Sequence, residues 1–402
     1  MSSALLAVSV VATPAVAQDG AHKVILDTDM VELFDDGMAM LLLDRAPNID
    51  LLGVTDVVGN TPMPTGVAMG ARQLEAIGST TPIYQGSRYG IRFWRGSNPE
   101  ALAAEELFSP VVGWAGYMKP YLPGIAGDPM AEWDQVYQEL YGEAPTYPYV
   151  YGPGSPDPDG NDEAVEFLVN TVHKYPGEVT IVAIGPLTNI ARAIMADPTF
   201  SQNVKQIAYM GGSFYLPGNS SASAEFNWWA DPDAAKIAVR SQWGDPESET
   251  YKLYGNQMID GLEANWNTGP MPEDLYPKMV ADTFPGIAAL FQKREEEIKA
   301  SGWGSIVPDN IWDLFAAGWV IDPSIVLSRN DSPRSDDGVP QPMSGVYVDV
   351  NSEYGIDYGK STAFTADLGP VATQKAAIQN FIDEQKFWFD LVYPLTQDPS
   401  QQ

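Results

Sequence analysis

Short apolar runs alternate with stretches of helical spacing along much of the chain, and this alternation restricts the fold more than any other feature. Strands are predicted at 23–26, 49–58, 82–84, 179–184 and 204–210, and helices at 37–43, 64–77, 161–174, 187–195 and 232–239. Such alternation is typical of parallel βαβ units. We therefore predict an α/β fold, with a doubly wound, mostly parallel sheet flanked by helices. Residues 360–395 return to helical spacing and are expected to close a single large domain over 19–402.

The stretch 97–160 breaks this alternation and is rich in Trp, Tyr, Pro and Gly. We interpret it as an insertion, partly helical, that lies over or beside the mouth of the site. A flexible linker between independent domains is the alternative. The many aromatic residues disfavour a linker, because linkers rarely carry so much buriable surface.

Residues 1–18 form a short run of small and apolar residues that ends in Ala15-Val16-Ala17. This ending is typical of a signal-peptidase site, so we expect a signal peptide, a mature chain that starts near Gln18, and a periplasmic or secreted protein. The basic residues that usually open such a peptide are missing, which a truncated start or a mis-called initiation codon would explain. The run is too short to span a bilayer, and no other transmembrane segment is predicted.

The charge balance excludes several partners, since 53 acidic residues stand against 22 basic ones, for a net charge of -31. An anionic surface repels phosphate backbones and anionic lipid, so neither nucleic acid nor a membrane is an expected partner. The absence of cysteine excludes disulfides and zinc–sulfur sites, and the two histidines exclude a multi-histidine metal site. Any metal must be held by oxygen, which favours a hard cation such as Ca²⁺ or Mg²⁺.

Four aspartates lie close together directly after the first predicted strand, namely Asp27, Asp29, Asp35 and Asp36. One or two of them can cap the helix that begins at Gly37, but the remaining charges repel one another unless a cation lies among them. Ca²⁺ takes six to eight oxygen ligands. In doubly wound sheets, ligands bind at the carboxyl ends of the strands. The sequence therefore predicts a hard-cation site at the end of the first strand.

Five motifs in order give the chain a resemblance to a known family. The first is Asp27-Thr28-Asp29 followed by Asp35-Asp36, and the others are Gly-Asn at 59–60, GPLTNIA at 185–191, a long motif over 210–235, and Asp313 within 311–314. Together they resemble the inosine-uridine-preferring nucleoside hydrolases over most of residues 23–330. The resemblance implies a calcium-dependent hydrolase of N-ribosyl bonds.

The resemblance also implies roles for individual residues. Ca²⁺ would be bound by the side chains of Asp29, Asp36 and Asp313 and by the carbonyl oxygen of Ile184. Asp29 would also act as general base toward a cation-bound water, and Asp27 would brace the loop. Ribose would be bound by Asp35, Asn60, Asn219, Glu225 and Asn227. Taken singly, each of these asparagines is more typical of a turn residue with local hydrogen bonds.

The sequence departs from the family pattern in two places. Five residues, 30–34, separate Asp29 from Asp35 where the family usually has three, which adds Glu32 as a possible extra ligand and leaves the placement of Asp35 and Asp36 open. Many members have a histidine just before the late aspartate, and Trp312 stands there instead. Neither His22 nor His173 is expected near the site.

Trp312 makes the chain similar to the purine-specific branch of the family, in which indoles stack on the base. The candidates for contact with the base are Trp312, Trp228, Trp94, Trp114, Arg88 and Tyr89. Core packing is the more common role for any single aromatic residue.

The function that follows from the resemblance is hydrolysis of the N-glycosidic bond of ribonucleosides, purine more than pyrimidine, to free base and ribose. One alternative is a hydrolase of another N-glycoside or sugar derivative. The other is a non-catalytic nucleoside- or sugar-binding protein that keeps the calcium site. Asp29 favours an enzyme, because a pure binder needs no base. Relatives are often dimers or tetramers, so a homodimer or homotetramer is expected.

Overall fold

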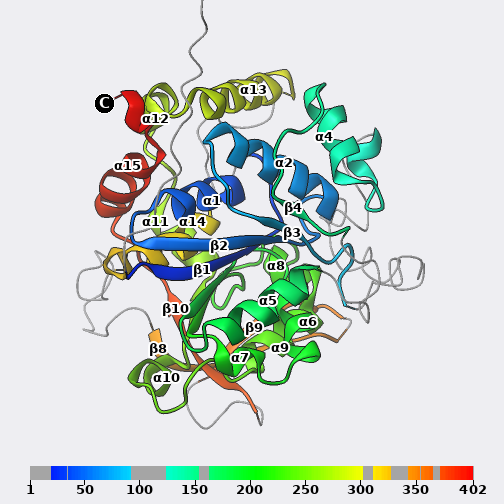
Figure 1. The fold of residues 1–402 in the computed structure, drawn as a ribbon. Coiled ribbons are helices and arrows are strands. Elements are labelled where there is room, and N and C mark those ends of the chain that lie inside the picture. The colour runs from blue at the N-terminus through cyan, green and yellow to red at the C-terminus, as the bar shows by residue number, and fades with distance from the viewer. Residues whose placement is uncertain are drawn as a thin grey trace, which may run out of the picture.

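The computed structural model describes residues 20–33, 35–91, 124–153, 163–301, 311–326, 343–353, 355–364 and 372–401. The predicted signal peptide at 1–18 lies outside these residues. A ten-stranded sheet runs through the molecule in the order β4-β3-β2-β1-β5-β6-β7-β10-β8-β9 (Figure 1). Its strands are β1 His22–Thr28, β2 Ile49–Asp56, β3 Ile83–Gln85, β4 Val150–Tyr151, β5 Val179–Ala183, β6 Gln206–Met210, β7 Gln257–Asp260, β8 Met343–Val350, β9 Ser361–Phe364 and β10 Gln374–Gln379.

Neighbouring strands pair in parallel from β4 at one edge as far as β10. Only β8, which pairs with β10, and β9, which pairs with β8, are joined antiparallel at the other edge. The prediction of a doubly wound, mostly parallel sheet is therefore confirmed. From β1 the chain builds outward through β2, β3 and β4, then returns to place β5 on the other side of β1. The order in which strands are added to the sheet therefore reverses between β1 and β5. In such sheets, ligands bind outside the carboxyl ends of the strands at this point.

One face of the sheet is covered by α1 Asp35–Arg45, α2 Met63–Ala76 and α14 Asp313–Ile321 (Figure 1). Helices α1 and α14 pack against each other and are buried along nearly their whole length. Their sequences accordingly show little polar character after the first turn, as expected for helices without a solvent face. Both helices begin with aspartate, so the fold brings two acidic helix starts together.

The other face is covered by α5 Glu163–Lys174, α6 Thr188–Ala196, α7 Phe200–Asn203 and α9 Pro232–Arg240. Alternate residues of the central strands separate the two cores: Leu26 packs toward α1, whereas Ile25 packs toward α5 and α6. The remaining helices are α4 Trp133–Tyr141, α8 Phe226–Ala230, α10 Glu249–Tyr254, α11 Leu262–Thr268, α12 Leu275–Asp282, α13 Pro285–Ser301 and α15 Tyr393–Thr396.

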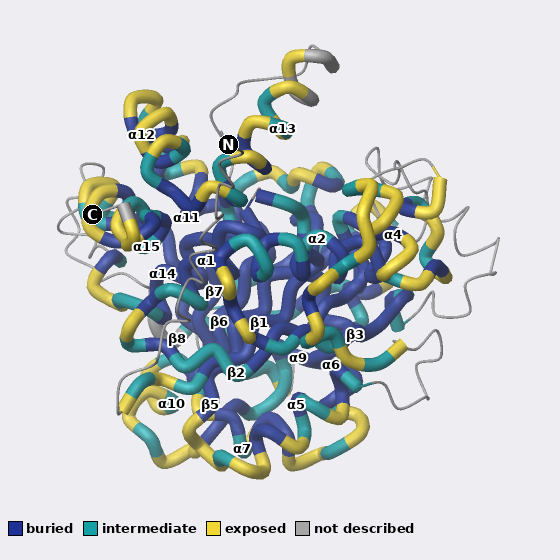
Figure 2. The backbone as a smooth tube through the Cα atoms, turned by 45° about the horizontal axis from the view of Figure 1, so that its top comes forward, coloured by how far each residue is buried: buried dark blue, intermediate teal, exposed yellow. Residues whose placement is uncertain are grey.

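Only part of the predicted insertion, residues 124–153, lies in the described chain. Its helix α4 packs on α2, and its last residues form β4, which pairs with β3 at the edge of the sheet. Figure 2 shows exposed residues along α4, α12 and α13, outside the buried sheet. No helix among the described residues is long and apolar enough to cross a membrane.

The prediction of helical spacing through 360–395 is wrong for its first half. Strands β9 and β10 occupy 361–364 and 374–379, and helical structure begins only at residue 384, just before the π-helical segment Lys386–Val392. The apolar residues of β10 are buried against β7 and β8. Pairing with strands distant in sequence, which local spacing does not show, determines the structure here.

Candidate metal and nucleoside site

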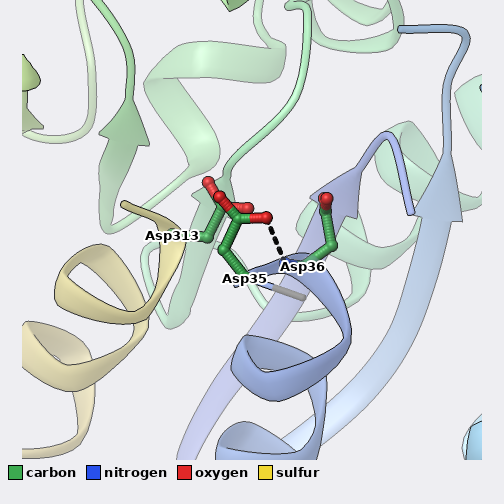
Figure 3. A group of neighbouring side chains, drawn as sticks. All are labelled: Asp35, Asp36 and Asp313. Carbon is green, nitrogen blue, oxygen red and sulfur yellow. Dashed lines mark hydrogen bonds between the residues drawn. The ribbon is translucent and has the colours of Figure 1, made fainter. Parts of the chain in front are cut away.

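Acidic side chains from three elements meet beyond the carboxyl end of β1. Strand β1 ends at Thr28, with Asp29 next in the chain; α1 begins at Asp35 and α14 at Asp313. Carboxylate oxygens of Asp35, Asp36 and Asp313 lie within 4.8 Å of one another, and all three side chains are buried (Figure 3). The positive ends of two helices favour negative charge at this point, but three buried carboxylates exceed what helix ends offset.

Burial and mutual repulsion make these carboxylates reluctant to ionise. The pKa values of Asp29, Asp35 and Asp313 are raised well above the usual range, first by burial and then by neighbouring carboxylates. Burial raises the pKa of Asp36 to about 6, although the Thr28 hydroxyl, 2.5 Å from Asp36 Oδ1, opposes the rise. A divalent cation among the four would reverse the effect, because it favours the ionised form of each.

Asp29 is enclosed by two glycine-containing motifs. A Cβ added to Gly59 would lie 2.1 Å from Asp29 Oδ2, and one added to Gly185 would lie 2.7 Å from the Asp29 nitrogen. The backbone N–H of Asn60 donates to Asp29 Oδ2 at 2.6 Å. Asp29 Oδ1 is buried and has no hydrogen-bond partner among the described residues. One oxygen of Asp29 is therefore fixed by the backbone, and the other remains to contact a ligand.

Asp27, the last acidic residue of β1, is buried beside the cluster and is hydrogen-bonded to neighbouring elements. Its Oδ1 accepts hydrogen bonds from the Thr55 hydroxyl at 2.6 Å and from Asn189 Nδ2 at 2.8 Å. Asn189 also donates to the Asp56 carbonyl and accepts from the Ser87 N–H. The asparagine of the GPLTNIA motif thus joins the ends of β1 and β2 and the loop after β3, a role that the sequence alone did not show.

The ribose-binding candidates differ in burial and in their contacts with the cluster. Asn60 is half-buried, and its Nδ2 lies 3.4 Å from Asp36 Oδ2. Asn227 is buried and donates to the Ile184 carbonyl at 2.8 Å, so the proposed carbonyl ligand lies beside it. Asn219 is exposed on the loop before α8.

Glu225 is the N-cap of α8 and accepts from three backbone N–H groups, those of Gly212, Asn227 and Trp228. Burial raises its pKa to about 7, although these hydrogen bonds oppose the rise. Its carboxylate therefore fixes the start of α8, and with it the position of Asn227, by the usual physics of a helix cap.

The aromatic candidates separate into one residue near the cluster and one in the core. Trp312 precedes Asp313, is half-buried, and has an Nε1 with no hydrogen-bond partner among the described residues. Trp228 is fully buried, with edge-to-face contacts to Tyr209 and Phe214. Its placement is that of a core residue. Trp94 and Trp114 lie outside the described residues.

Arg88 is buried and makes three hydrogen bonds to backbone carbonyls, those of Pro129, Ala131 and Pro153. The guanidinium therefore attaches residues 129–131 and 153 to the loop after β3. Burial lowers its pKa. Tyr89, its neighbour, is half-buried and packs against a small cluster that includes Val57 and Trp229.

Asp35 and Asp36 lie in the cluster although the segment before them has two residues more than the family pattern. Glu32, left open by the sequence as an extra ligand, points elsewhere and contacts Tyr141 and Lys293. Inside the loop, Gln73 of α2 accepts from the Leu33 N–H at 3.0 Å and lies 3.4 Å from the Met30 sulfur. The role of Gln73 was not predicted, because only the fold brings α2 to this loop.

A further buried carboxylate, that of Asp56, was also missed. It ends β2, pairs in register with Thr28, and has an Oδ1 without a hydrogen-bond partner among the described residues. Burial, then the charges of Asp36 and Asp27, raises its pKa well above the usual value. The available signal was a charged residue inside the apolar run 49–58.

Comparison with known proteins points in one direction. The family model described as inosine-uridine preferring nucleoside hydrolase matches residues 24–389. A probable uridine nucleosidase 1 of Oryza sativa is 33% identical over 219 residues, which cover 54% of this chain and 55% of that protein. The match thus spans about half the length of that relative. A pyrimidine-specific ribonucleoside hydrolase RihB of Escherichia coli is 26% identical and covers 91% of this chain and 95% of its own.

Solved structures agree on the fold. A plant nucleoside hydrolase superimposes with a TM-score of 0.63 at 22% identity, covering 94% of this chain and 99% of its own. A purine-preferring ribonucleoside hydrolase from Gardnerella vaginalis gives a TM-score of 0.60 at 21% identity, covering 93% and 98%.

Proposed function

Because the chain belongs to the inosine-uridine preferring nucleoside hydrolase family, we propose that it hydrolyses the N-glycosidic bond of ribonucleosides to free base and ribose, purine nucleosides more efficiently than pyrimidine ones. The observation that carries the proposal is the buried cluster of Asp35, Asp36 and Asp313 with Asp29 beside it, at the point where the sheet reverses direction. Such a cluster is costly for folding alone, and a ligand-binding role accounts for it.

The donor set fits a calcium ion. All the candidate ligands are oxygens: the side chains of Asp29, Asp36 and Asp313 and the carbonyl of Ile184, with Asp35 in the same group. Asp29 Oδ1, buried without a hydrogen-bond partner among the described residues, supports a missing positive ligand. When bound, the cation would hold the ribose hydroxyls and make a neighbouring water easier to deprotonate.

The residues around the cluster supply the rest of the reaction. Asp29, with Oδ2 fixed by the Asn60 N–H, would accept the proton of the attacking water at Oδ1. Cleavage of the N-glycosidic bond leaves positive charge on the ribose, and the surrounding carboxylates stabilise that charge more than the neutral substrate. Asp35, Asn60, Asn219, Glu225 and Asn227 would bind the ribose oxygens, and Asp27 would keep the loop in position.

The preference for purines is argued from the leaving group. His173 lies in the last turn of α5 and pairs with Asp197, which follows α6. It is therefore not one of the residues that meet at the carboxyl end of β1. Among the aromatic candidates in the described part of the chain, Trp312, half-buried next to Asp313, is the one beside the cluster and is proposed to stack on a departing base. A purine offers the larger ring for stacking and a ring nitrogen for protonation. The relatives differ in base preference, since one is a probable uridine nucleosidase, one a pyrimidine-specific hydrolase and one a purine-preferring hydrolase.

A panel of nucleosides tests the proposal. Release of reducing sugar from inosine, guanosine, adenosine and uridine is measured with and without a chelator. We expect release from the purines, lower kcat/KM for uridine, and loss of activity with chelator. Higher kcat/KM for uridine would overturn the purine preference. Nucleoside binding without any release would overturn hydrolysis and favour a binding protein.

A further inference from the structure

We propose that Glu32 is a positioning residue, which holds the loop 30–34 and the aspartates that follow it in place by linking the loop to α4 and α13. The inference rests on the proposed cation site and deepens it, because Glu32 itself contributes no ligand there. Its two partners, Tyr141 and Lys293, do not belong to the cluster.

Glu32 makes two contacts with helices distant in the chain. The hydroxyl of Tyr141, on α4, donates to Glu32 Oε1, and the ammonium of Lys293, on α13, lies 3.7 Å from Oε2. The Glu32 side chain is only 13% exposed, whereas Glu178, in the surface ion pair with Lys23, is 56% exposed. Solvent therefore screens the contacts of the Glu32 carboxylate less than those of the exposed Glu178 carboxylate.

Tyr141 is itself held in place. Its ring packs edge-on against Tyr137 with centroids 4.7 Å apart, and the cations of Arg72 and Lys293 lie 5.2 and 4.9 Å from its centroid. Burial and the charge of Glu32 raise the pKa of Tyr141, so its hydroxyl remains a donor. The contact partner of Glu32 is therefore a fixed group and not a mobile surface side chain.

The loop needs support from outside. Leu33 adopts a φ of 45°, in the left-handed region that costs a non-glycine residue about 1 kcal/mol or more. Gln73 holds the loop from inside through the Leu33 N–H. Glu32 holds it from outside, and it is one of the five residues 30–34 that make this loop longer than the family pattern. Together the two contacts determine where Asp35 and Asp36 begin α1.

The test measures loop opening and cation binding separately on the full chain. Amide hydrogen exchange of the metal-free protein follows residues 30–37, and Ca²⁺ titration by calorimetry gives Kd. The variants are Glu32→Ala, Tyr141→Phe and Glu32→Gln, which keeps an acceptor for Tyr141 but loses the charge. Glu178→Ala, which removes an exposed ion pair, is the matched control.

We expect Glu32→Ala and Tyr141→Phe to raise exchange in residues 30–37 and the Ca²⁺ Kd by roughly tenfold, because hydrogen bonds to charged groups are among the stronger ones. Glu32→Gln should give a smaller change, and Glu178→Ala no more than about twofold in either measurement.

Unchanged exchange in residues 30–37 in both Glu32→Ala and Tyr141→Phe would overturn the inference, whether or not the protein binds Ca²⁺. A uniform rise over the whole chain would also overturn it, since that reports general destabilisation. If Glu32→Ala weakened Ca²⁺ binding and Tyr141→Phe left it unchanged, Glu32 would be a ligand instead. Failure of the proposed function has a different signature, a wild-type protein that neither binds Ca²⁺ nor hydrolyses nucleosides.

Discussion

Asp29 is the residue on which the proposed reaction depends most. Its two oxygens differ, because the Asn60 N–H occupies Oδ2 while Oδ1 has no hydrogen-bond partner among the described residues. A general base is expected to contribute about 10²–10⁴-fold to the rate. Asp29→Asn keeps the shape and the contact to Asn60, so we expect kcat for inosine to fall by about that factor while the fold is retained.

Circular dichroism and kcat with saturating Ca²⁺ check this prediction. Glu273→Gln, which removes an exposed carboxylate elsewhere, is the control and should leave kcat unchanged. An Asp29→Asn protein with kcat within threefold of wild type would rule out the role of base.

Trp312 is the residue proposed to contact the base. If its indole stacks on the departing base, Trp312→Ala should lower kcat/KM for inosine several-fold more than for uridine, since a stacking contact contributes about 0.5–1.5 kcal/mol and the purine has the larger ring. Trp266→Ala, which removes an indole that is 64% exposed on α11, should change neither value. Equal losses for both nucleosides would instead indicate a packing role for Trp312.

At the level of elements, the backbone approaches Asp29 so closely that the motifs Gly59-Asn60 and Gly185-Pro186 have a steric explanation. Gly59→Ala would place a Cβ 2.1 Å from Asp29 Oδ2, which forces the carboxylate or the β2–α2 loop to move. We expect the Ca²⁺ Kd to rise at least tenfold, measured by calorimetry. Gly70→Ala, in the middle of α2 with its nearest atom at 3.4 Å, is the control and should be neutral or slightly stabilising.

Asn189 connects three elements, and its replacement should lower the free energy of unfolding. Asn189→Ala would leave the Ser87 N–H and the Asp56 carbonyl without this partner in a buried region. Unpaired buried polar groups cost about 1–3 kcal/mol each. We therefore expect the free energy of unfolding in urea to fall by roughly 2–4 kcal/mol. Asn203→Ala, on the short helix α7, should cost less than about 1 kcal/mol.

The elements also show what sequence can and cannot predict. The run 23–26 predicted β1 because a strand buried on both faces is aliphatic throughout, and the five motifs placed Asp29, Asp36 and Asp313 at strand and helix ends. Strand β10 was taken for helix, since its pairing with β7 and β8 is not encoded in local spacing. Gln73, Asp56 and Asn189 were missed because each acts across two or three elements.

For Glu32, the sequence suggested a role that the packing of distant helices does not support. Its position in an acidic loop suggested a metal ligand, and only the packing of α4 and α13 reveals Tyr141 and Lys293 as its partners.

For the molecule as a whole, stability should depend on pH and cation together. Folding raises the pKa of Asp36 from 3.8 to about 6 and that of Glu225 from 4.5 to about 7. Groups with raised pKa stabilise the folded state fully below the unfolded pKa, and this contribution is lost as pH rises through the folded pKa. The metal-free protein should therefore lose stability between about pH 4 and 7.

Calcium should reverse this trend, because it favours the ionised carboxylates that are costly without it. Thermal unfolding at pH 5 and pH 8 checks the prediction: Ca²⁺ should raise Tm more at pH 8 than at pH 5. The reverse order, or an equal rise at both values, would separate cation binding from these carboxylates.

We propose above that the aspartate cluster binds a calcium ion that nucleoside hydrolysis requires. The most direct measurement is ribose release from inosine by chelated protein titrated with Ca²⁺, for wild type and for Asp313→Ala. We predict that wild-type activity returns at about one Ca²⁺ per chain and that Asp313→Ala stays largely inactive or needs far more Ca²⁺. Full activity in the chelated protein, or a normal Ca²⁺ requirement in Asp313→Ala, would contradict the account.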